Sequence, residues 1–232
     1  MDTPLAVVTG ASRGLGRALA GALNERGWRL VVDGRDPDRL AAAVAALPRP
    51  EAVTAIPGDV ADPDHRAALA EAVGPALNLL VNNASDLGPS PLPPLARLRP
   101  EELQRVLAVN TVAPLALVQL TLPELERASG RVLDVSSDAA VEAYAGWGGY
   151  GASKAALDQL SAVLAVEHPA LRIYAVDPGD MNTAMHRAAE PGEDLSGLPS
   201  PESVVPALLR LVDDDLPSGR YRAAELRPAV AR

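Results

Sequence analysis

The sequence predicts a doubly wound α/β protein, in which helices cover both faces of a parallel sheet. Short apolar runs alternate with longer helix-like stretches along the whole chain. The short runs are apolar at successive positions, as strands are when both faces of their sheet are covered. No linker or internal repeat divides the 232 residues, a length that suits one domain. We therefore expect a single domain over residues 1–232, with about seven strands.

The strands are expected where apolar, Val-rich runs end in turn-forming residues such as Gly, Pro, Asn or Asp. In chain order these runs cover residues 5–10, 28–34, 51–59, 76–84, 130–137, 171–179 and 219–224. The helices are expected where apolar residues recur every three to four positions. They cover residues up to 26 after the first strand, then 39–47, 65–73, 100–125, 149–166 and 202–212. Together they describe a Rossmann-type fold.

Two stretches interrupt the alternation. Residues 88–100 are dense in proline and are expected to form a surface loop that leads into a helix. Residues 184–201 are polar and contain Pro and Gly. A loop of this length is often a lid over a binding site, although variable surface explains it equally well.

Composition excludes several classes of protein. The net charge of -9 argues against a nucleic-acid partner. The chain has no cysteine, and its three histidines lack the spacing of metal ligands, so we expect no metal site. No run reaches the roughly 18 apolar residues of a membrane span, and the N-terminal residues do not resemble a signal peptide. These observations predict a soluble, cytoplasmic protein with no membrane partner.

A glycine-rich turn follows the first strand. The segment TGASRGLG, residues 9–16, runs directly into a helix and places glycine at positions 10, 14 and 16. Such glycines allow a sharp turn and a close approach to a phosphate, which the helix N-terminus then attracts. A tight turn without a ligand is the alternative. The position after strand one of a doubly wound sheet favours a nucleotide.

The end of the second strand bears on the choice of nucleotide. Arg35 follows Gly34 there, and Arg13 lies inside the glycine turn. Arginine suits the 2′-phosphate of NADP, whereas an acid would hydrogen-bond the free 2′-hydroxyl of NAD. Asp33 is close enough in sequence to be read as that acid. We expect NADP(H), and NAD(H) stays open as the alternative.

Lys154 is the only lysine among 21 basic residues, and it follows Tyr150 by four positions. Residues four apart share one face of a helix, so the two side chains are expected to project together. A cation at ~4 Å in a medium of dielectric ~20 favours the phenolate by roughly 4 kcal/mol, which lowers a tyrosine pKa from about 10 towards neutrality. Ser136 and Ser137 end strand five nearby. The alternatives are a solvated lysine and an ordinary serine cap.

Together these motifs resemble the short-chain dehydrogenase/reductase family over essentially the whole chain. TGASRGLG matches the family's cofactor turn, NNA at 82–84 its strand-four motif, and PGDMNT at 178–183 its PGxxxT segment. Ser137, thirteen residues before Tyr150, and Lys154 match the serine and the YxxxK motif. Asn110 matches the catalytic asparagine. Ser85 departs from the usual glycine and Asp134 from the frequent asparagine, and both are expected to affect local packing only.

The resemblance implies roles for these residues. Tyr150 would transfer a proton to or from the substrate oxygen, Ser137 would hold that oxygen, Lys154 would lower the tyrosine pKa and bind the nicotinamide ribose, and Asn110 would anchor a water. The cofactor contacts that it implies are Gly10, Ser12, Arg13, Gly14, Leu15, Gly16, Arg35, Asp59, Val60, Asn82, Ala84, Tyr150, Lys154, Pro178, Gly179 and Thr183. It also implies a homodimer or homotetramer that pairs helices 100–125 and 149–166.

The substrate is not specified by these motifs. Candidates for its pocket are Trp147, Asp86, Leu87, Asp138, Met181, Met185 and His186; Trp147 is equally well a packing residue. We expect an NADP(H)-dependent ketoreductase or alcohol dehydrogenase acting on a small molecule. An NADP-binding regulator without turnover, and an epimerase or dehydratase that works by transient oxidation, are the alternatives.

Overall fold

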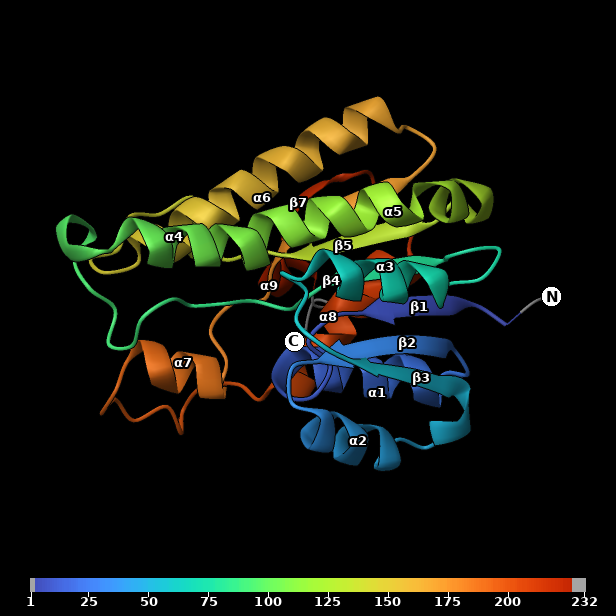
Figure 1. Ribbon diagram of the computed structural model, residues 1–232, viewed down its shortest axis with the longest axis horizontal. Coiled ribbons are helices and arrows are strands. Elements are labelled where there is room, and N and C mark those ends of the chain that lie inside the picture. Colours follow the sequence, from blue (N-terminus) through green and yellow to red (C-terminus); the bar gives the residue numbers. More distant parts are fainter. Residues whose placement is uncertain (1–2, 227–232) are drawn as a thin grey trace, which may run out of the picture.

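The computed structural model describes residues 3–226 and contains one seven-stranded sheet in which all strands are parallel (Figure 1). The strand order is β3-β2-β1-β4-β5-β6-β7, which confirms the predicted doubly wound fold. The strands are β1 (Leu5–Val8), β2 (Arg29–Gly34), β3 (Val53–Pro57), β4 (Leu79–Asn82), β5 (Arg131–Val135), β6 (Arg172–Asp177) and β7 (Gly219–Arg222). The predicted domain limits, 1–232, include residues at both ends that lie outside the described part.

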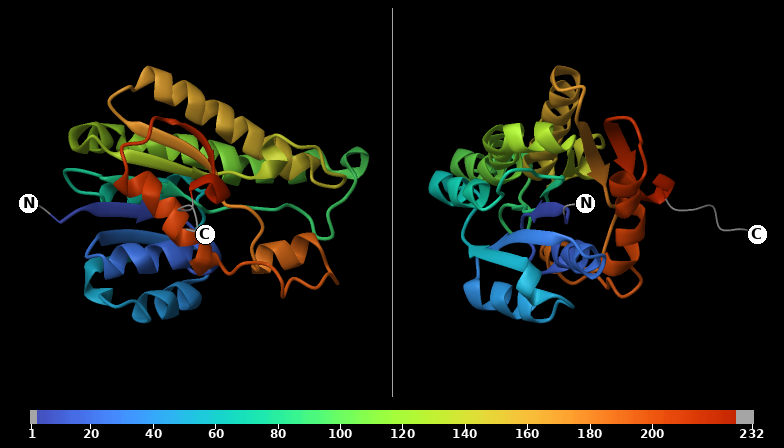
Figure 2. Two further views of the ribbon diagram at one scale, coloured as in Figure 1. Left: turned by 180° about the vertical axis from the view of Figure 1, so that it is seen from behind. Right: turned by 90° about the vertical axis from the view of Figure 1, so that its right-hand side faces the viewer.

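Helices cover both faces of the sheet (Figure 2). One core cluster joins α1 (Gly14–Glu25) and α8 (Pro201–Asp213) to one face of the sheet. A second joins α3 (Pro63–Glu71) and α5 (Ala113–Ala128) to the other face. The remaining helices are α2 (Pro37–Ala45), α4 (Pro100–Leu107), α6 (Gly148–Glu167), α7 (Ala184–Ala189) and α9 (Ala223–Leu226). Strands β1 and β4 are buried throughout, so the centre of the sheet lies in the core between the two helix layers.

The predicted strands are too long at their carboxyl ends. Residues 9–10, 58–59, 83–84, 136–137 and 178–179 leave the sheet and form loops. The expectation that strands are buried on both faces fails at the two edges of the sheet, because β3 and β7 consist of exposed and half-buried residues. Both are short edge strands with one unpaired side. The loops matter for function, since a doubly wound sheet binds its ligands beyond these carboxyl ends.

The helix boundaries differ from the predicted ones for local reasons. Helices α2 and α3 begin two residues early because Asp36 and Asp62 cap them and proline occupies the first helical position. The long helix predicted over 100–125 is interrupted by a π-helical turn at Ala108–Val112 and continues to Ala128. The predicted loop at 184–201 contains α7. Figure 1 shows α7 apart from the other helices, beyond the carboxyl ends of the strands.

Within the described residues, one helical segment is long and apolar enough to be a candidate membrane span. It runs over Pro100–Ala128, and half of its most apolar window is buried in the protein. Its buried residues, such as Leu117 and Leu125, pack in the core beneath the sheet. A core helix of a globular domain has these properties.

Candidate active site

A cavity of about 1480 Å³ opens at the carboxyl edge of the sheet. The loops that follow β1 to β6 line it, and the segment around α7 covers one side. Fifteen of the predicted site residues lie on its wall, namely Gly10, Ser12, Arg13, Gly14, Leu15, Arg35, Asp59, Val60, Ala84, Ser137, Tyr150, Lys154, Pro178, Gly179 and Thr183. The fold thus brings together residues that are spread over most of the chain.

The glycine turn is shaped to approach a ligand closely. Gly10 and Gly14 have φ angles of +67° and +57°, which side chains other than glycine rarely adopt. A Cβ at Gly16 would lie 2.3 Å from the Asn83 amide nitrogen and 2.5 Å from the Gly10 carbonyl oxygen, so the helix packs directly on the turn. Gly16 itself does not line the cavity. Arg13, at the N-cap of α1, makes no side-chain cap, and the first N–H groups of this 12-residue helix can therefore receive an anion.

Asp33 lines the cavity, but its carboxylate is buried and hydrogen-bonded within the protein. Its side chain is 1% exposed. One carboxylate oxygen accepts a 2.6 Å hydrogen bond from the Gly10 N–H, and the other lies 3.1 Å from His65 Nε2. The acid that suggested NAD therefore holds the glycine turn against α3. Four arginines reach the same end of the cavity, namely Arg13, Arg17, Arg35 and Arg39.

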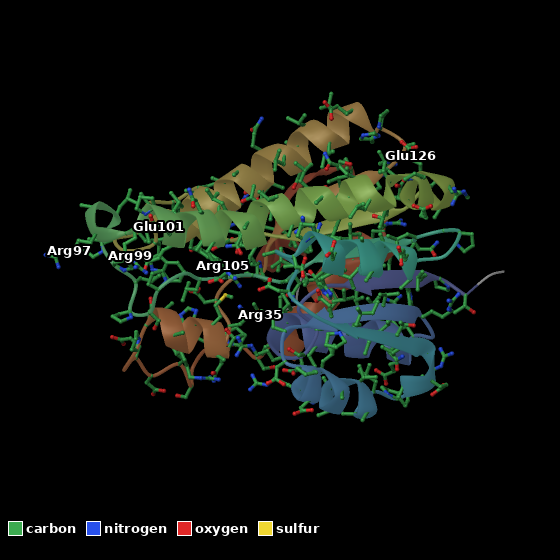
Figure 3. The ribbon with its side chains drawn as sticks, viewed as in Figure 1. Arg35, Arg97, Arg99, Glu101, Arg105 and Glu126 are labelled. Atoms are coloured by element: carbon green, nitrogen blue, oxygen red, sulfur yellow. The ribbon has the colours of Figure 1, made fainter. Side chains whose placement is uncertain are left out.

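Asp59 lies on the wall beside these arginines. Its carboxylate accepts hydrogen bonds from the Ala61 N–H at 2.9 Å and from Arg105 at 2.7 Å. Burial acts to raise the pKa of Asp59, but the hydrogen bonds and the charges of Arg105 and Arg35 lower it overall. In Figure 3, Arg105 is labelled at the lower side of its own helix α4, and Arg35 is labelled below it in the same region. Asp59 therefore stays ionised and available at the cavity wall.

Asn110 lies beneath the site and not on the cavity wall. The π-helical turn buries it completely. Its amide oxygen accepts from the Asp86 N–H at 2.7 Å and from the Ser85 hydroxyl at 3.2 Å, and its amide nitrogen donates to Ser153 at 2.9 Å. These contacts join the loop after β4 to α6. A π-turn of this kind is frequent at functional sites.

Asn82 also lies away from the cavity. It is buried, and its amide donates a 2.7 Å hydrogen bond to Asp134. Ser161, on α6, donates to the other oxygen of Asp134 at 2.6 Å. The structure thus places Asn82 behind the cavity wall, where its side chain holds this buried acid.

The two departures from the family pattern touch the site. Ser85 contacts Asn110 and lines the cavity beside Tyr150. Burial lowers the pKa of Lys154, and the negative charge of Asp134 opposes that fall. The expectation that both affect packing alone is wrong for Ser85, because its hydroxyl contacts the predicted catalytic Asn110 directly. Asp134 contacts Asn82 and Ser161 and acts on Lys154 through its charge.

Tyr150 and Lys154 project together from the first two turns of α6, as their spacing predicts. Tyr150 is 8% exposed and Lys154 2%. The lysine Nζ donates to the Val135 carbonyl oxygen at 2.7 Å and lies 5.6 Å from the centre of the Tyr150 ring. Trp147 packs edge-on against that ring and lines the cavity, which makes it both a packing residue and part of the pocket wall.

Burial controls the acid–base properties of this pair. It raises the pKa of Tyr150 to about 12, although the hydroxyls of Ser85 and Ser137 act to lower it. It lowers the pKa of Lys154 to about 8, against the opposing charges of Asp134 and Asp158. The predicted fall in the tyrosine pKa is therefore wrong for the chain alone, since the loss of hydration outweighs the hydrogen bonds of the two serine hydroxyls.

Several wall residues were not among the predicted contacts. Asn83 donates to the carbonyl oxygens of Thr9 and Gly10 and so closes the glycine turn. Tyr144 and Arg17 line the cavity. No motif in the sequence marks these residues as contacts. The one indication is that Arg17 lies one helical turn after Arg13 and shares its face of α1. Of the suggested substrate residues, Asp138, Met181, Met185 and His186 line the cavity, whereas Asp86 and Leu87 are not on its wall.

Comparison with known proteins agrees with this geometry. The model of the short chain dehydrogenase family matches residues 4–194. The chain belongs to the short-chain dehydrogenase family. It is 32% identical over 225 residues to the uncharacterized oxidoreductase YciK of Escherichia coli, covering 93% of this chain and 88% of the relative. This short-chain dehydrogenase is accordingly an oxidoreductase, as its motifs predict.

Solved structures show the same fold. A Shigella flexneri protein described as a short chain dehydrogenase, in complex with NADP, has a TM-score of 0.89 at 28% identity and covers 97% of this chain and 98% of its own. A similarly described Escherichia coli protein, in complex with NADPH, has a TM-score of 0.88 at 30% identity, with coverages of 96% and 97%. The fold is thus shared with proteins whose structures hold NADP or NADPH.

Proposed function

We propose that this short-chain dehydrogenase is a cytoplasmic, NADP(H)-dependent carbonyl reductase that acts on a small ketone or aldehyde. One observation carries the proposal. A single cavity has arginines at one end and, at the other, a buried tyrosine beside a serine hydroxyl and a buried lysine. The basic end suits the phosphates of a dinucleotide, and the other end suits proton transfer to a carbonyl oxygen.

The residues present fit NADP(H). The glycine turn and the N-terminus of α1 would receive the pyrophosphate, and Arg13 and Arg35 would bind the 2′-phosphate. Asp33 does not compete, because the Gly10 N–H and His65 already occupy its carboxylate. The two structurally similar proteins that were solved with NADP and NADPH support the choice of NADP(H) over NAD(H). When bound, NADPH supplies the hydride.

The side chains around the carbonyl supply the proton and its positioning. With a pKa of about 12, Tyr150 keeps its proton at neutral pH, and a neutral phenol is the form that can donate to a carbonyl oxygen. Ser137 would hold that oxygen in place by a hydrogen bond. Lys154 is charged below its pKa of about 8, and it would stabilise the phenolate left after proton transfer. These protonation states favour reduction near neutral pH.

The segment 184–201 would act as a lid over the substrate. Met185 and Ala188 of α7 pack in one small cluster with Tyr150 and Leu87, and the segment lines the cavity over much of its length. The segment that would close the pocket thus belongs to the same apolar cluster as the proposed proton donor. Lids of this kind exclude water and complete the site.

A homodimer or homotetramer is the proposed assembly. Apolar side chains stand exposed on the two helices that the family resemblance pairs between subunits, namely Val112 and Leu120 at α5 and Val163 and Val166 on α6. Pairing these faces would bury them. Light scattering is expected to give the mass of two or four chains, and replacing Val166 with Glu should shift it towards one chain. A monomeric wild type would contradict the assembly.

Removal of the arginines tests the choice of cofactor. In the double variant Arg13→Ala, Arg35→Ser, KM for NADPH is expected to rise roughly ten-fold or more, because charge-assisted contacts to the 2′-phosphate are lost. KM for NADH should hardly change. The measurement is steady-state reduction with each cofactor. Arg97→Ser is the control, since Arg97 is exposed and lies off the cavity wall. Equal losses for both cofactors, or a wild type that prefers NADH, would contradict the assignment.

A further inference from the structure

Asp138 places a carboxylate directly beside the serine that would hold the substrate oxygen. It follows Ser137 in sequence and lines the same cavity. The Ser137 hydroxyl donates to one oxygen of Asp138 at 3.0 Å. In the ligand-free chain, therefore, the proton that a carbonyl oxygen would need is directed at Asp138.

All the contacts of Asp138 are donors. The Oδ1 atom accepts from the Ala139 N–H at 2.8 Å as well as from Ser137, and Oδ2 accepts from the Tyr144 hydroxyl at 3.0 Å. That hydroxyl also lies 2.9 Å from Glu142, and its single proton can serve only one of the two carboxylates at a time. Asp138 is therefore an acceptor with unused capacity that faces the cavity.

Substrate binding changes this balance. When Ser137 turns its proton to a carbonyl oxygen, Oδ1 of Asp138 keeps only the Ala139 N–H as a donor. The loss of one hydrogen bond to this half-buried carboxylate is unfavourable unless another donor replaces it. The lost donor and its acceptor are 3.0 Å apart, a spacing similar to that between oxygens on neighbouring carbon atoms. A substrate with a hydroxyl or amine next to its carbonyl can supply the missing hydrogen bond.

We propose that Asp138 selects carbonyl substrates that carry a hydroxyl or amine on the carbon next to the carbonyl. The inference rests on the proposed reductase function and adds the substrate class to it. Asp138 acts as the acceptor for that neighbouring donor, while Ser137 donates to the carbonyl oxygen. An unsubstituted ketone leaves the carboxylate short of a donor and is bound in the productive geometry less often.

Matched ketones test the proposal. The pairs are hydroxyacetone against acetone and 3-hydroxy-2-butanone against 2-butanone, each reduced by the full chain with NADPH. The wild type is expected to favour the hydroxyketone in kcat/KM by roughly ten-fold or more, the usual effect of one hydrogen bond to a charged group. In Asp138→Asn, and in Asp138→Ala, the preference should fall to about two-fold or less.

The control is Glu142→Gln, which makes the same carboxylate-to-amide change at a residue off the cavity wall and should keep the preference. An equal kcat/KM for both members of a pair, or a preference that survives in Asp138→Asn, would overturn the inference while the reductase function stands. The inference would also be overturned if the enzyme reduced other carbonyl compounds but none of these four ketones. If NADPH reduces no carbonyl at all, both the inference and the proposed function are wrong.

Discussion

Tyr150→Phe is expected to lower kcat for carbonyl reduction by about 10²–10⁴-fold, the usual contribution of a positioned general acid. The phenol is the group whose raised pKa keeps a proton available in the buried pocket. Phenylalanine keeps the ring and its edge-on contact with Trp147, so the pocket should retain its shape. Titration of NADPH fluorescence should give a dissociation constant close to that of the wild type.

Tyr221→Phe is the matched control for this variant. Tyr221 lies on β7, where its hydroxyl donates to the Pro217 carbonyl oxygen, and it is not on the cavity wall. Its loss should leave turnover unchanged. If Tyr150→Phe retains more than about a tenth of the wild-type kcat, another group donates the proton, because a catalytic acid normally contributes more than this.

Lys154→Arg preserves the charge but is expected to lower kcat/KM by about 10²-fold, the effect of a small misplacement in a catalytic site. Lys154 is 2% exposed and its Nζ fits against the Val135 carbonyl oxygen. The longer, planar guanidinium cannot occupy that space without moving Tyr150 or β5. The melting temperature distinguishes a local effect from loss of the fold.

The pH dependence of the two proteins adds a second test. Burial lowers the pKa of Lys154 to about 8, so the side chain is charged below this pH and neutral above it. In the wild type, kcat/KM for NADPH should therefore fall as the pH rises through about 8. Arginine stays charged, and the fall should be absent from the residual activity of the variant. Near-normal turnover in Lys154→Arg, or an unchanged alkaline limb, would contradict the role of the lysine.

Local spacing was sufficient to predict part of the site. A four-residue separation on a helix places Tyr150 and Lys154 on one face whatever the rest of the fold does. The turn at residues 9–16 likewise predicts a close approach, because its glycines precede a helix N-terminus. The alternation of apolar runs predicted the sheet, except at edge strands such as β3, whose exposure depends on neighbours that the sequence does not identify.

Contacts between distant segments account for what the sequence did not predict. The sequence alone makes Asp33 a candidate ribose ligand. In the fold, His65, which is 32 residues away in the sequence, contacts the Asp33 carboxylate. The burial of Asn110 depends on a π-helical turn, and no local pattern distinguishes that turn from a continuous helix. The pKa of Tyr150 is set mainly by burial, to which α7 and the loop after β4 contribute. Such properties require the packed structure.

The most direct test of the account is hydride transfer from the cofactor to the substrate. NADPH deuterated at the nicotinamide C4, in each stereochemical form, would be incubated with the wild type and a panel of ketones and aldehydes, and the products analysed by mass spectrometry. For a carbonyl reductase we expect stoichiometric NADP formation and one deuterium on the carbinol carbon of the product, from only one of the two stereochemical forms of the cofactor. Product formed without deuterium while the NADPH is recovered unchanged would point to epimerisation or dehydration, and NADPH binding without any product to a regulator. Either result would contradict a carbonyl reductase.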